Sequence, residues 1–251
     1  MRVTVDGNIG CGKSTLLRAL GALAGSVGTA EEPLARWAPW LERLYDPASP
    51  SGAMEFQLRV WLDRCAAAPQ PAAGVTDLFV ERSPLFQQQV FLESNRRLGR
   101  ITEPGVALLN ELYDGHTAWA PDVYVYLRSD PAACAARIQA RGRSCEGGIP
   151  LDYLQLLHEA HEAACLRVVA ARGCGRVPAG AAVVCVDVEG KTPAQVVEAV
   201  LGQVYDDESD PRVNWRAVEQ TLLDGGVYSQ VAPWQEVPAW VKQTLGRART
   251  V

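Results

Sequence analysis

Positive charge is scarce in this sequence. Lysine and arginine together number 24, against 29 aspartates and glutamates, which gives a formal net charge of −5 at pH 7. A protein that binds nucleic acid or a membrane surface through its phosphates normally carries a basic excess. We therefore expect neither nucleic acid nor a membrane among the partners of this protein.

Long apolar runs and paired cysteines are also missing. No segment approaches the roughly 18 consecutive apolar residues of a membrane-spanning helix. A strand-like segment begins at residue 2, so we expect no signal or transit peptide. The seven cysteines are scattered and include no Cys-x-x-Cys pair. Such a set indicates free thiols in a reducing compartment rather than disulfides or a zinc site. We therefore expect a cytoplasmic protein.

Short, mainly apolar segments that alternate with helical patterns indicate the fold class. Five segments are predicted to be strands: Val3–Val5, Val27–Ala30, Leu78–Glu81, Val123–Leu127 and Val183–Val186. Because helical patterns fill the gaps, we predict an α/β fold, with a five-stranded parallel sheet and helices on both faces. Asp130 and Thr192, each followed by proline, are predicted to begin two of the helices.

The pattern changes after residue 205. An acidic segment follows over residues 206–211, and the remainder of the chain holds three of the seven tryptophans. We therefore assign residues 1–205 to one domain. Residues 206–251 are predicted to form a C-terminal, tryptophan-containing appendage that packs on this domain or on a partner.

The most informative segment is Gly-Asn-Ile-Gly-Cys-Gly-Lys-Ser, over residues 7–14. It matches the phosphate-binding pattern G-x-x-x-x-G-K-[ST] and lies between a predicted strand and a predicted helix, as that loop requires. Lys13 would reach the β- and γ-phosphates, and Ser14 would bind Mg²⁺. The residues expected to bind a nucleoside triphosphate here are Gly7, Asn8, Ile9, Gly10, Cys11, Gly12, Lys13, Ser14 and Thr15.

Two charged clusters follow predicted strands, where ligands bind in an open α/β sheet. Glu31 and Glu32 follow the second strand, and a carboxylate there could accept a proton from an acceptor hydroxyl. A solvated acidic loop is the alternative. Glu81 and Arg82 end the third strand, where they could help to hold Mg²⁺ and stabilise charge on the acceptor oxygen. A structural ion pair is the alternative.

Arginines and histidines mark a third region. Arg137, Arg141 and Arg143 precede a glycine-rich turn. We predict an arginine-bearing lid that closes over the phosphates and excludes water, with a basic helix C-terminus as the alternative. His158 and His161 follow on the next helix, and no further metal ligands are evident. We therefore expect both histidines to be exposed.

Together these motifs resemble the deoxynucleoside kinase family, which includes cellular deoxycytidine, deoxyguanosine and mitochondrial thymidine kinases and their insect and herpesviral relatives. The matching motifs are Gly-Asn-Ile-Gly-x-Gly-Lys-Ser, Glu-Pro-x-x-x-Trp, Phe-Gln, Glu-Arg-Ser, and Arg-x-Arg followed by Glu and Ile-Pro-Leu-x-Tyr-Leu. They occur in the family's order over about residues 1–205. The resemblance implies a P-loop kinase that phosphorylates the 5′-hydroxyl of deoxynucleosides, with ATP as donor, Mg²⁺ and a homodimeric assembly.

The resemblance also implies catalytic roles. Glu32, five residues before Trp37, matches the general base for the 5′-hydroxyl, whereas Glu31 is offset by one position. Arg82 matches the residue that holds the 5′-oxygen, and Glu81 matches the residue near Mg²⁺. The positively charged residues implied to act on the phosphates are Lys13, Arg137, Arg141 and Arg143.

Further positions match the family's nucleoside pocket. Aromatic side chains wall the base, where stacking contributes about 1–3 kcal/mol per base, an amide binds the edge of the base, and a tyrosine–glutamate pair grips the sugar 3′-hydroxyl. The walls are Trp37, Phe56 and Phe91, the amide is Gln57, and the sugar pair is Tyr45 and Glu146. Without the surrounding motifs, Phe56 and Phe91 would be interpreted as ordinary core residues.

Three positions bear on base preference. Relatives specific for deoxycytidine or purine deoxynucleosides carry an arginine and an aspartate at two pocket positions, and thymidine-accepting relatives are apolar there. This chain has Arg64 at the first position, as in the deoxycytidine type, and Gln87 at the second, which fits neither pattern. Val60 is a third position that sets the pocket size. The resemblance favours deoxycytidine or a broad range of bases, and thymidine stays open.

Three other functions remain possible from the sequence. One is a thymidine kinase of the viral type. A second is a nucleoside monophosphate kinase, which would need an arginine clamp for the acceptor phosphate; Arg36 and Arg64 are the nearby candidates. A third is a nucleotide-binding subunit that regulates a partner through the tryptophan-containing appendage.

Overall fold

The computed structural model describes residues 1–22, 27–46, 48–143, 148–170 and 181–205. Five strands form one parallel sheet in the order β2-β3-β1-β4-β5. The strands are β1 (Arg2–Gly7), β2 (Val27–Ala30), β3 (Asp77–Glu81), β4 (Val123–Arg128) and β5 (Ala182–Asp187). Each predicted strand is confirmed within two residues at either end, and the sheet is parallel as predicted.

Helices connect the strands, and one of them is a π-helix, η1, that continues directly from a short α-helix. The helices are α1 (Lys13–Gly21), α2 (Leu34–Tyr45), α3 (Gly52–Arg64), α4 (Pro84–Phe86), η1 (Gln87–Leu92), α5 (Glu93–Arg97), α6 (Glu103–His116), α7 (Pro131–Arg141), α8 (Leu151–Ala170) and α9 (Pro193–Val204). The predicted helix starts are confirmed. Asp130 accepts hydrogen bonds from the amides of Ala132 and Ala133, and Thr192 forms a capping box with Gln195.

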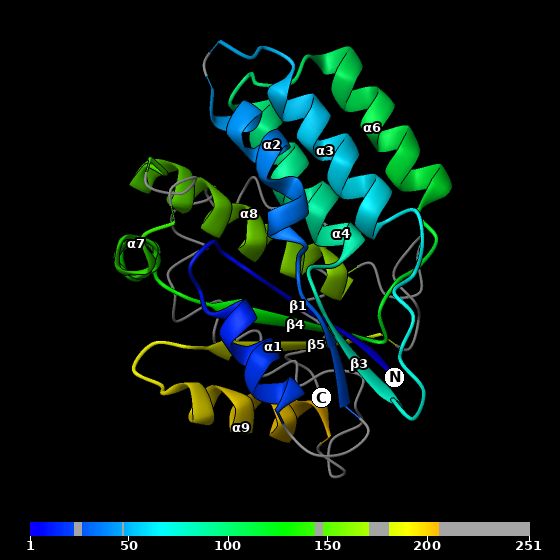
Figure 1. Ribbon diagram of the computed structural model, residues 1–251, viewed down its shortest axis with the longest axis vertical. Coiled ribbons are helices and arrows are strands. Elements are labelled where there is room, and N and C mark those ends of the chain that lie inside the picture. The colour runs from blue at the N-terminus through cyan, green and yellow to red at the C-terminus, as the bar shows by residue number, and fades with distance from the viewer. Residues whose placement is uncertain (23–26, 47, 144–147, 171–180, 206–251) are drawn as a thin grey trace.

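Helices cover both faces of the sheet, as predicted (Figure 1). On one face, Val5 and Val125 pack with α1 and α9. On the other face, Tyr124 and Tyr126 pack with α8 and η1. Because both faces are buried, β4 and β5 are apolar along almost their whole length, whereas the middle strand β1 also buries the polar side chains of Thr4 and Asp6. A separate core holds α3 and α6 together, and in Figure 1 these helices and α2 lie beyond one edge of the main layers.

The histidine prediction is wrong. His161 is fully buried and His158 is half-buried. The ring of His161 stacks on that of Tyr126, with centroids 5.8 Å apart and an interplanar angle of 6°. Leu154, Leu157 and Cys165 occupy the same buried face of α8, so the helical spacing of these apolar residues marks this face as core.

Some predictions fall outside the described residues. The appendage at residues 206–251 and the sugar-binding candidate Glu146 are among them. None of the described helices has both the length and the apolar character required to cross a bilayer. The described cysteines are all free and buried: Cys11, Cys65, Cys134, Cys165 and Cys185.

Candidate active site

The phosphate loop joins β1 to α1 in a tightly curled conformation. Gly7 and Gly10 have φ angles of +147° and +82°, and a Cβ atom added to either would lie 2.6–2.7 Å from a backbone carbonyl oxygen. Only glycine fits such positions without strain. The Asn8 side chain donates to the carbonyl oxygen of Leu154 at 2.9 Å, which ties the loop to α8. This loop therefore has the shape that turns backbone N–H groups towards an anion.

Lys13, Ser14 and Glu81 meet at the mouth of the loop. Nζ of Lys13 donates to the carbonyl oxygens of Gly7 and Asn8 at 3.2 and 2.9 Å, and lies 3.9 Å from the Glu81 carboxylate. The Ser14 hydroxyl donates to both carboxylate oxygens of Glu81 at 3.3–3.4 Å. Hydroxyl and carboxylate oxygens are the ligand types that Mg²⁺ prefers. The oxygen atoms of Ser14 and Glu81 therefore fit a magnesium ion.

Arg82 adopts a strained backbone conformation at the end of β3. It is the only residue other than glycine with a positive φ angle, 62°, among those described. Its Nε donates to Glu32 at 2.8 Å, and a terminal nitrogen donates to the carbonyl oxygen of Gly7 at 3.0 Å. Its guanidinium lies 4.2 Å from the ring centroid of Phe91. Strain of this kind persists only where neighbouring contacts enforce it, and it is common at active sites.

Buried charges surround Arg82. Burial opposes its charged form, but the carboxylates of Glu32, Glu81 and Asp6 outweigh burial and raise the pKa of the guanidinium. Asp6 lies fully buried beneath the loop and accepts a hydrogen bond from the amide of Ser83 at 3.0 Å. Burial raises the pKa of Asp6 to about 6. Sequence reasoning did not identify Asp6, although its position directly before Gly7 placed it at the end of β1.

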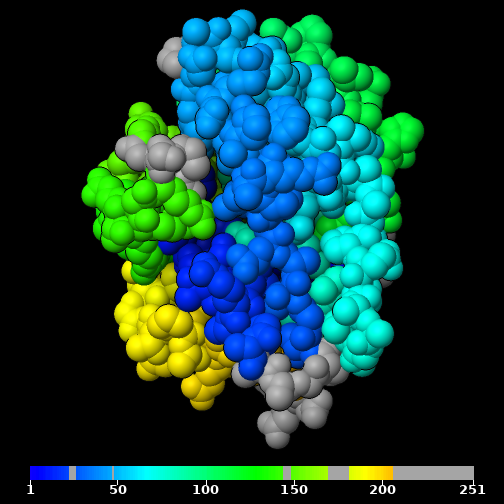
Figure 2. All heavy atoms as spheres, viewed as in Figure 1, coloured from blue at the N-terminus to red at the C-terminus, as the bar shows by residue number. Residues whose placement is uncertain are grey.

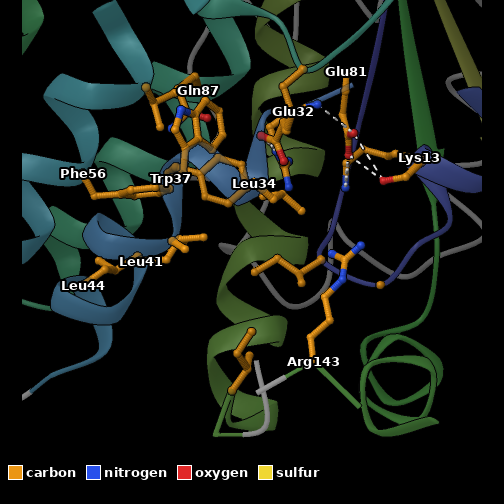
Figure 3. A pocket seen from close by; sticks show the side chains of 18 of the residues that line it. Lys13, Glu32, Leu34, Trp37, Leu41, Leu44, Phe56, Glu81, Gln87 and Arg143 are labelled. Atoms are coloured by element: carbon orange, nitrogen blue, oxygen red, sulfur yellow. Dashed lines mark hydrogen bonds and ion pairs between the residues drawn. The ribbon is translucent and has the colours of Figure 1, made fainter. Parts of the chain in front are cut away.

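A cavity of about 300 Å³ extends from the phosphate loop towards α2 and α3, a size typical of small-molecule sites. It brings together most of the predicted residues: Ile9, Gly10, Gly12, Lys13, Ser14, Thr15, Glu32, Trp37, Tyr45, Phe56, Gln57, Val60, Glu81, Arg82, Gln87, Phe91, Arg141 and Arg143. Figure 3 shows Lys13 and Glu81 on one side, Phe56 and Trp37 on the other, and Glu32 between them. In the space-filling view, α1 lies between α2 and α7 on this face (Figure 2).

Trp37 and Phe56 form the end of the cavity remote from the phosphate loop, and Phe91 lies nearer to the loop, against Arg82. Trp37 is buried, and its ring meets Phe56 edge to face, with centroids 5.8 Å apart. The indole nitrogen of Trp37 donates to Asp63 at 2.9 Å, which fixes the orientation of the ring. Phe91 lies under Arg82 on the opposite element, η1. The cavity therefore has aromatic groups from α2, α3 and η1 available for a planar ligand.

Two buried amides lie beside these rings. Gln57 of α3 is 1% exposed and Gln87 of η1 is 5% exposed. Nε2 of Gln87 donates to Oε1 of Gln57 at 3.4 Å. Val60 lies one helical turn after Gln57 and lines the same cavity. The sequence pattern did not predict contact between the two amides, since they come from different helices.

Arg64 lies outside the cavity. Its guanidinium donates to the backbone carbonyl oxygens of Glu81 at 2.6 Å, Glu31 at 3.2 Å and Ala30 at 3.5 Å. It therefore joins the ends of β2 and β3 instead of lining the pocket. The other candidate for a phosphate clamp, Arg36, is an exposed residue that forms an ion pair with Asp63 at 3.2 Å.

The arginines of the predicted lid are placed differently from one another. Arg141 ends α7 and is exposed, and Arg143 is half-buried; both line the cavity. Figure 3 shows Arg143 approaching from the side opposite Glu32 and Glu81. Arg137 does not line the cavity, because it binds Ser129 at 2.7 Å and Glu189 at 3.3 Å.

Gly7, Asn8 and Cys11 of the phosphate loop are also absent from the cavity lining.

Several lining residues were not predicted from the sequence. They are Arg18, Leu34, Ala38, Leu41, Leu44, Asn95, Ile149 and Tyr153. Leu41 and Leu44 lie four and seven residues after Trp37, so their helical spacing was a usable signal. Tyr153 belongs to the Ile-Pro-Leu-x-Tyr-Leu motif, whereas nothing in the local sequence distinguishes Asn95.

Comparison with known proteins agrees with this geometry. Residues 3–207 match the family described as deoxynucleoside kinase. The chain is 39% identical over 170 residues to the thymidine kinase of Ictalurid herpesvirus 1 (strain Auburn), covering 63% of this chain and 72% of that protein. It is 30% identical over 192 residues to deoxycytidine kinase 2 of Gallus gallus, covering 64% of this chain and 72% of that protein.

A solved structure is similar in fold. The deoxyadenosine kinase from M. mycoides with dCMP and dCDP bound superposes with a TM-score of 0.68 at 20% identity, covering 82% of this chain and 99% of that chain. The phosphate loop, the Glu32–Arg82 pair and the aromatic cavity thus occur in a chain whose family match spans nearly all the described residues. The chain belongs to the deoxynucleoside kinase family of phosphotransferases, as its motifs predict.

Proposed function

We propose that this protein transfers a phosphoryl group from ATP to the 5′-hydroxyl of deoxynucleosides, for nucleotide salvage. One observation carries the proposal: the Glu32–Arg82 pair, with an Nε–oxygen distance of 2.8 Å, lies between the phosphate loop and the aromatic end of one cavity. A nucleoside with its base among Trp37, Phe56 and Phe91 would direct its 5′-hydroxyl towards this pair.

Glu32 is the proposed general base, and Arg82 the residue that steadies the acceptor oxygen. Arg82 holds one carboxylate oxygen of Glu32 and leaves the other able to accept the hydroxyl proton. The guanidinium then lies beside the oxygen on which negative charge develops. Arg82 also donates a hydrogen bond to the carbonyl oxygen of Gly7. One side chain therefore contacts both Glu32, where the nucleoside hydroxyl would bind, and the phosphate loop, where the triphosphate would bind.

The phosphate side rests on Lys13, Ser14 and Glu81. We propose that Lys13 exchanges its two carbonyl partners for phosphate oxygens when a triphosphate enters the loop. Ser14 and Glu81 would hold Mg²⁺, which neutralises phosphate charge. Arg141 and Arg143 are the proposed lid arginines, which would cover the phosphates and exclude water. Arg137, bound to Ser129 and Glu189, is proposed to support this side from outside the cavity.

We propose that Tyr45 and Glu146 bind the sugar 3′-hydroxyl and that Gln57 binds the base edge, with deoxycytidine or a broad range of bases as acceptor. Thymidine remains an acceptor to be tested, since the relatives include thymidine and deoxycytidine kinases. Free, buried cysteines are usual in a reducing compartment, which supports a cytoplasmic location. A homodimer is also proposed from the resemblance, and residues 206–251 are proposed from the sequence to be an appendage that packs on the domain or on a partner.

Nucleoside monophosphates are poorer candidates as acceptors. An acceptor phosphate would need an arginine clamp, but Arg64 is engaged with three backbone carbonyl oxygens and Arg36 with Asp63. The test measures kcat/KM for the four deoxynucleosides and their 5′-monophosphates, with ATP and Mg²⁺. We expect turnover of at least one deoxynucleoside and none of its monophosphate. The reverse order would replace this proposal with a nucleoside monophosphate kinase.

A further inference from the structure

A single long hydrogen bond joins the two amides at the base end of the cavity. Nε2 of Gln87 donates to Oε1 of Gln57 at 3.4 Å, a long and therefore weak hydrogen bond. Within the described part of the chain, neither side-chain amide makes another hydrogen bond. Both residues line the cavity, and the polar atoms that do not join the two amides keep some exposure. These atoms are therefore available to a ligand.

We propose that Gln87 is a specificity-determining residue, which lets the Gln57–Gln87 pair accept both cytosine-like and thymine-like base edges by a coupled rotation of the two amides. This inference rests on the proposed function and names the range of bases that the same site accepts. Figure 3 shows Gln87 beside Trp37 and Phe56, at the end of the cavity remote from Lys13.

The chemistry of the amide group explains the coupling. A glutamine amide has an acceptor oxygen and a donor nitrogen, which exchange places when the group rotates by about 180°. If Gln57 rotates alone, its nitrogen meets the nitrogen of Gln87, and their hydrogen bond is lost. If Gln87 rotates as well, its oxygen accepts from Gln57 and the bond is restored. The pair therefore has two arrangements. Both keep the hydrogen bond between the two amides, but they present opposite patterns of donor and acceptor to the ligand.

Cytosine and thymine also carry opposite patterns of hydrogen-bond donors and acceptors along the edge of the base. Cytosine has an acceptor at N3 and a donor at its 4-amino group, whereas thymine has a donor at N3 and an acceptor at O4. A lone glutamine could match either base. A partner of fixed polarity would hold it in one arrangement, because a donor must face the oxygen of Gln57 and an acceptor must face its nitrogen. Gln87 imposes neither arrangement.

Among the described residues, neither Arg64 nor Arg82 sets the direction of this hydrogen bond in place of Gln87. Arg64, which lies on α3 with Gln57, is turned to the carbonyl oxygens of Ala30, Glu31 and Glu81. Arg82 is occupied by Glu32, Gly7 and the face of Phe91. Which of the two amides donates and which accepts therefore depends on Gln57 and Gln87 alone.

The test replaces Gln87 by groups of fixed polarity. Gln87→Glu offers only an acceptor when ionised, and Gln87→Lys offers only donors. We measure the ratio of kcat/KM for deoxycytidine to that for thymidine, with ATP and Mg²⁺. We expect the two variants to move this ratio in opposite directions, each by at least about tenfold from the parent, because one base then leaves a buried polar group unpaired. Shifts in the same direction, or both within threefold of the parent, would overturn the proposal.

Matched controls come from the same helix. Gln89 is half-buried, lies outside the cavity and bonds Arg167. Gln89→Glu and Gln89→Lys should leave the ratio within threefold of the parent; equal shifts in these variants would overturn a specific role for Gln87. Circular dichroism checks that each variant folds. If a Gln87 variant does not fold, calorimetric dissociation constants of the parent decide. The proposal requires values for deoxycytidine and thymidine within about tenfold, and a difference above about 100-fold contradicts it.

The outcome also separates this inference from the function on which it rests. A parent enzyme that phosphorylates none of the deoxynucleosides refutes the proposed function and this inference with it. A parent that phosphorylates them, with variants whose ratios do not diverge, refutes only the role of Gln87.

Discussion

Arg82 and Glu32, fifty positions apart in the chain, are joined by a hydrogen bond of 2.8 Å at the mouth of the phosphate loop. The strained backbone of Arg82, with φ of 62°, is held by contacts on each side. Its amide donates to the carbonyl oxygen of Val5 at 2.9 Å, and the next amide, that of Ser83, donates to Asp6. The pair is therefore positioned by β1 and β3 before any ligand binds.

Replacing Arg82 by lysine should impair catalysis strongly. Lysine keeps the charge but lacks the planar fork that binds Glu32 and Gly7 simultaneously. We expect kcat to fall by roughly 10²–10³-fold, the range measured when one charge-stabilising donor is removed from an active site. Steady-state kinetics with the best deoxynucleoside checks this. Arg96→Lys, at a half-buried ion pair with Glu93, is the control; an equal loss in both variants would contradict a specific role for Arg82.

Removing the ring of Phe56 should weaken nucleoside binding more than turnover. Phe56 is half-buried beside Trp37 and lines the cavity. If it stacks on the base, Phe56→Ala loses about 1–3 kcal/mol of binding, or roughly 5- to 150-fold in the dissociation constant. Isothermal titration calorimetry with the nucleoside measures this directly. An unchanged dissociation constant would show that Phe56 contributes only to packing.

The buried carboxyl of Asp6 should leave a signature in the pH dependence of stability. Its pKa is raised from 3.8 to about 6 by burial, so the folded protein holds this proton more tightly than the unfolded chain. The resulting stabilisation is fully present below pH 3.8 and is lost as the pH rises through about 6. Asp6→Asn retains an acceptor for the Ser83 amide but cannot ionise.

The free energy of unfolding of Asp6→Asn, relative to the parent, should therefore increase by about 1–3 kcal/mol between pH 4 and pH 7. Urea denaturation of both proteins at several pH values measures the difference. Parallel stability curves over this range would show that Asp6 does not titrate in this way.

Two of the three histidines, His161 and His116, provide a matched test of the core. His161 is fully buried against Tyr126, Phe86 and Phe91, whereas His116 is exposed at the end of α6. We expect His161→Ala to reduce the free energy of unfolding by about 2–4 kcal/mol, because it leaves a cavity. His116→Ala should change it by less than about 0.5 kcal/mol. Similar values for the two variants would contradict the packing of α8.

Local patterns predicted the strands, the phosphate loop and the helix starts at Asp130 and Thr192, because these features depend on neighbouring residues. The position of Arg64 was not predictable in the same way. Its three acceptors lie at the ends of β2 and β3, and only the folded sheet brings these carbonyl oxygens together. The contact between Gln57 and Gln87 likewise requires the packing of α3 near η1, which no local pattern specifies.

The burial of His161 shows a different kind of failure. Its spacing from Leu154, Leu157 and Cys165 placed it on the apolar face of α8, but its residue type favoured an exposed position. Burial lowers its pKa well below the usual range, and the nearby Arg82 adds to this effect. Packing among aromatic rings therefore decided the position of a side chain that composition alone assigns to the surface.

The replacement of Glu32 by glutamine tests the central claim most directly. Glutamine keeps the shape and the hydrogen bond to Arg82 but cannot accept the 5′-hydroxyl proton, so kcat should fall by about 10²–10⁴-fold. The calorimetric dissociation constant of the nucleoside should remain within threefold. Glu31→Gln, at the exposed neighbouring carboxylate, should retain parental kcat. A Glu32→Gln enzyme with unchanged kcat, or a loss of equal size in Glu31→Gln, would contradict the account.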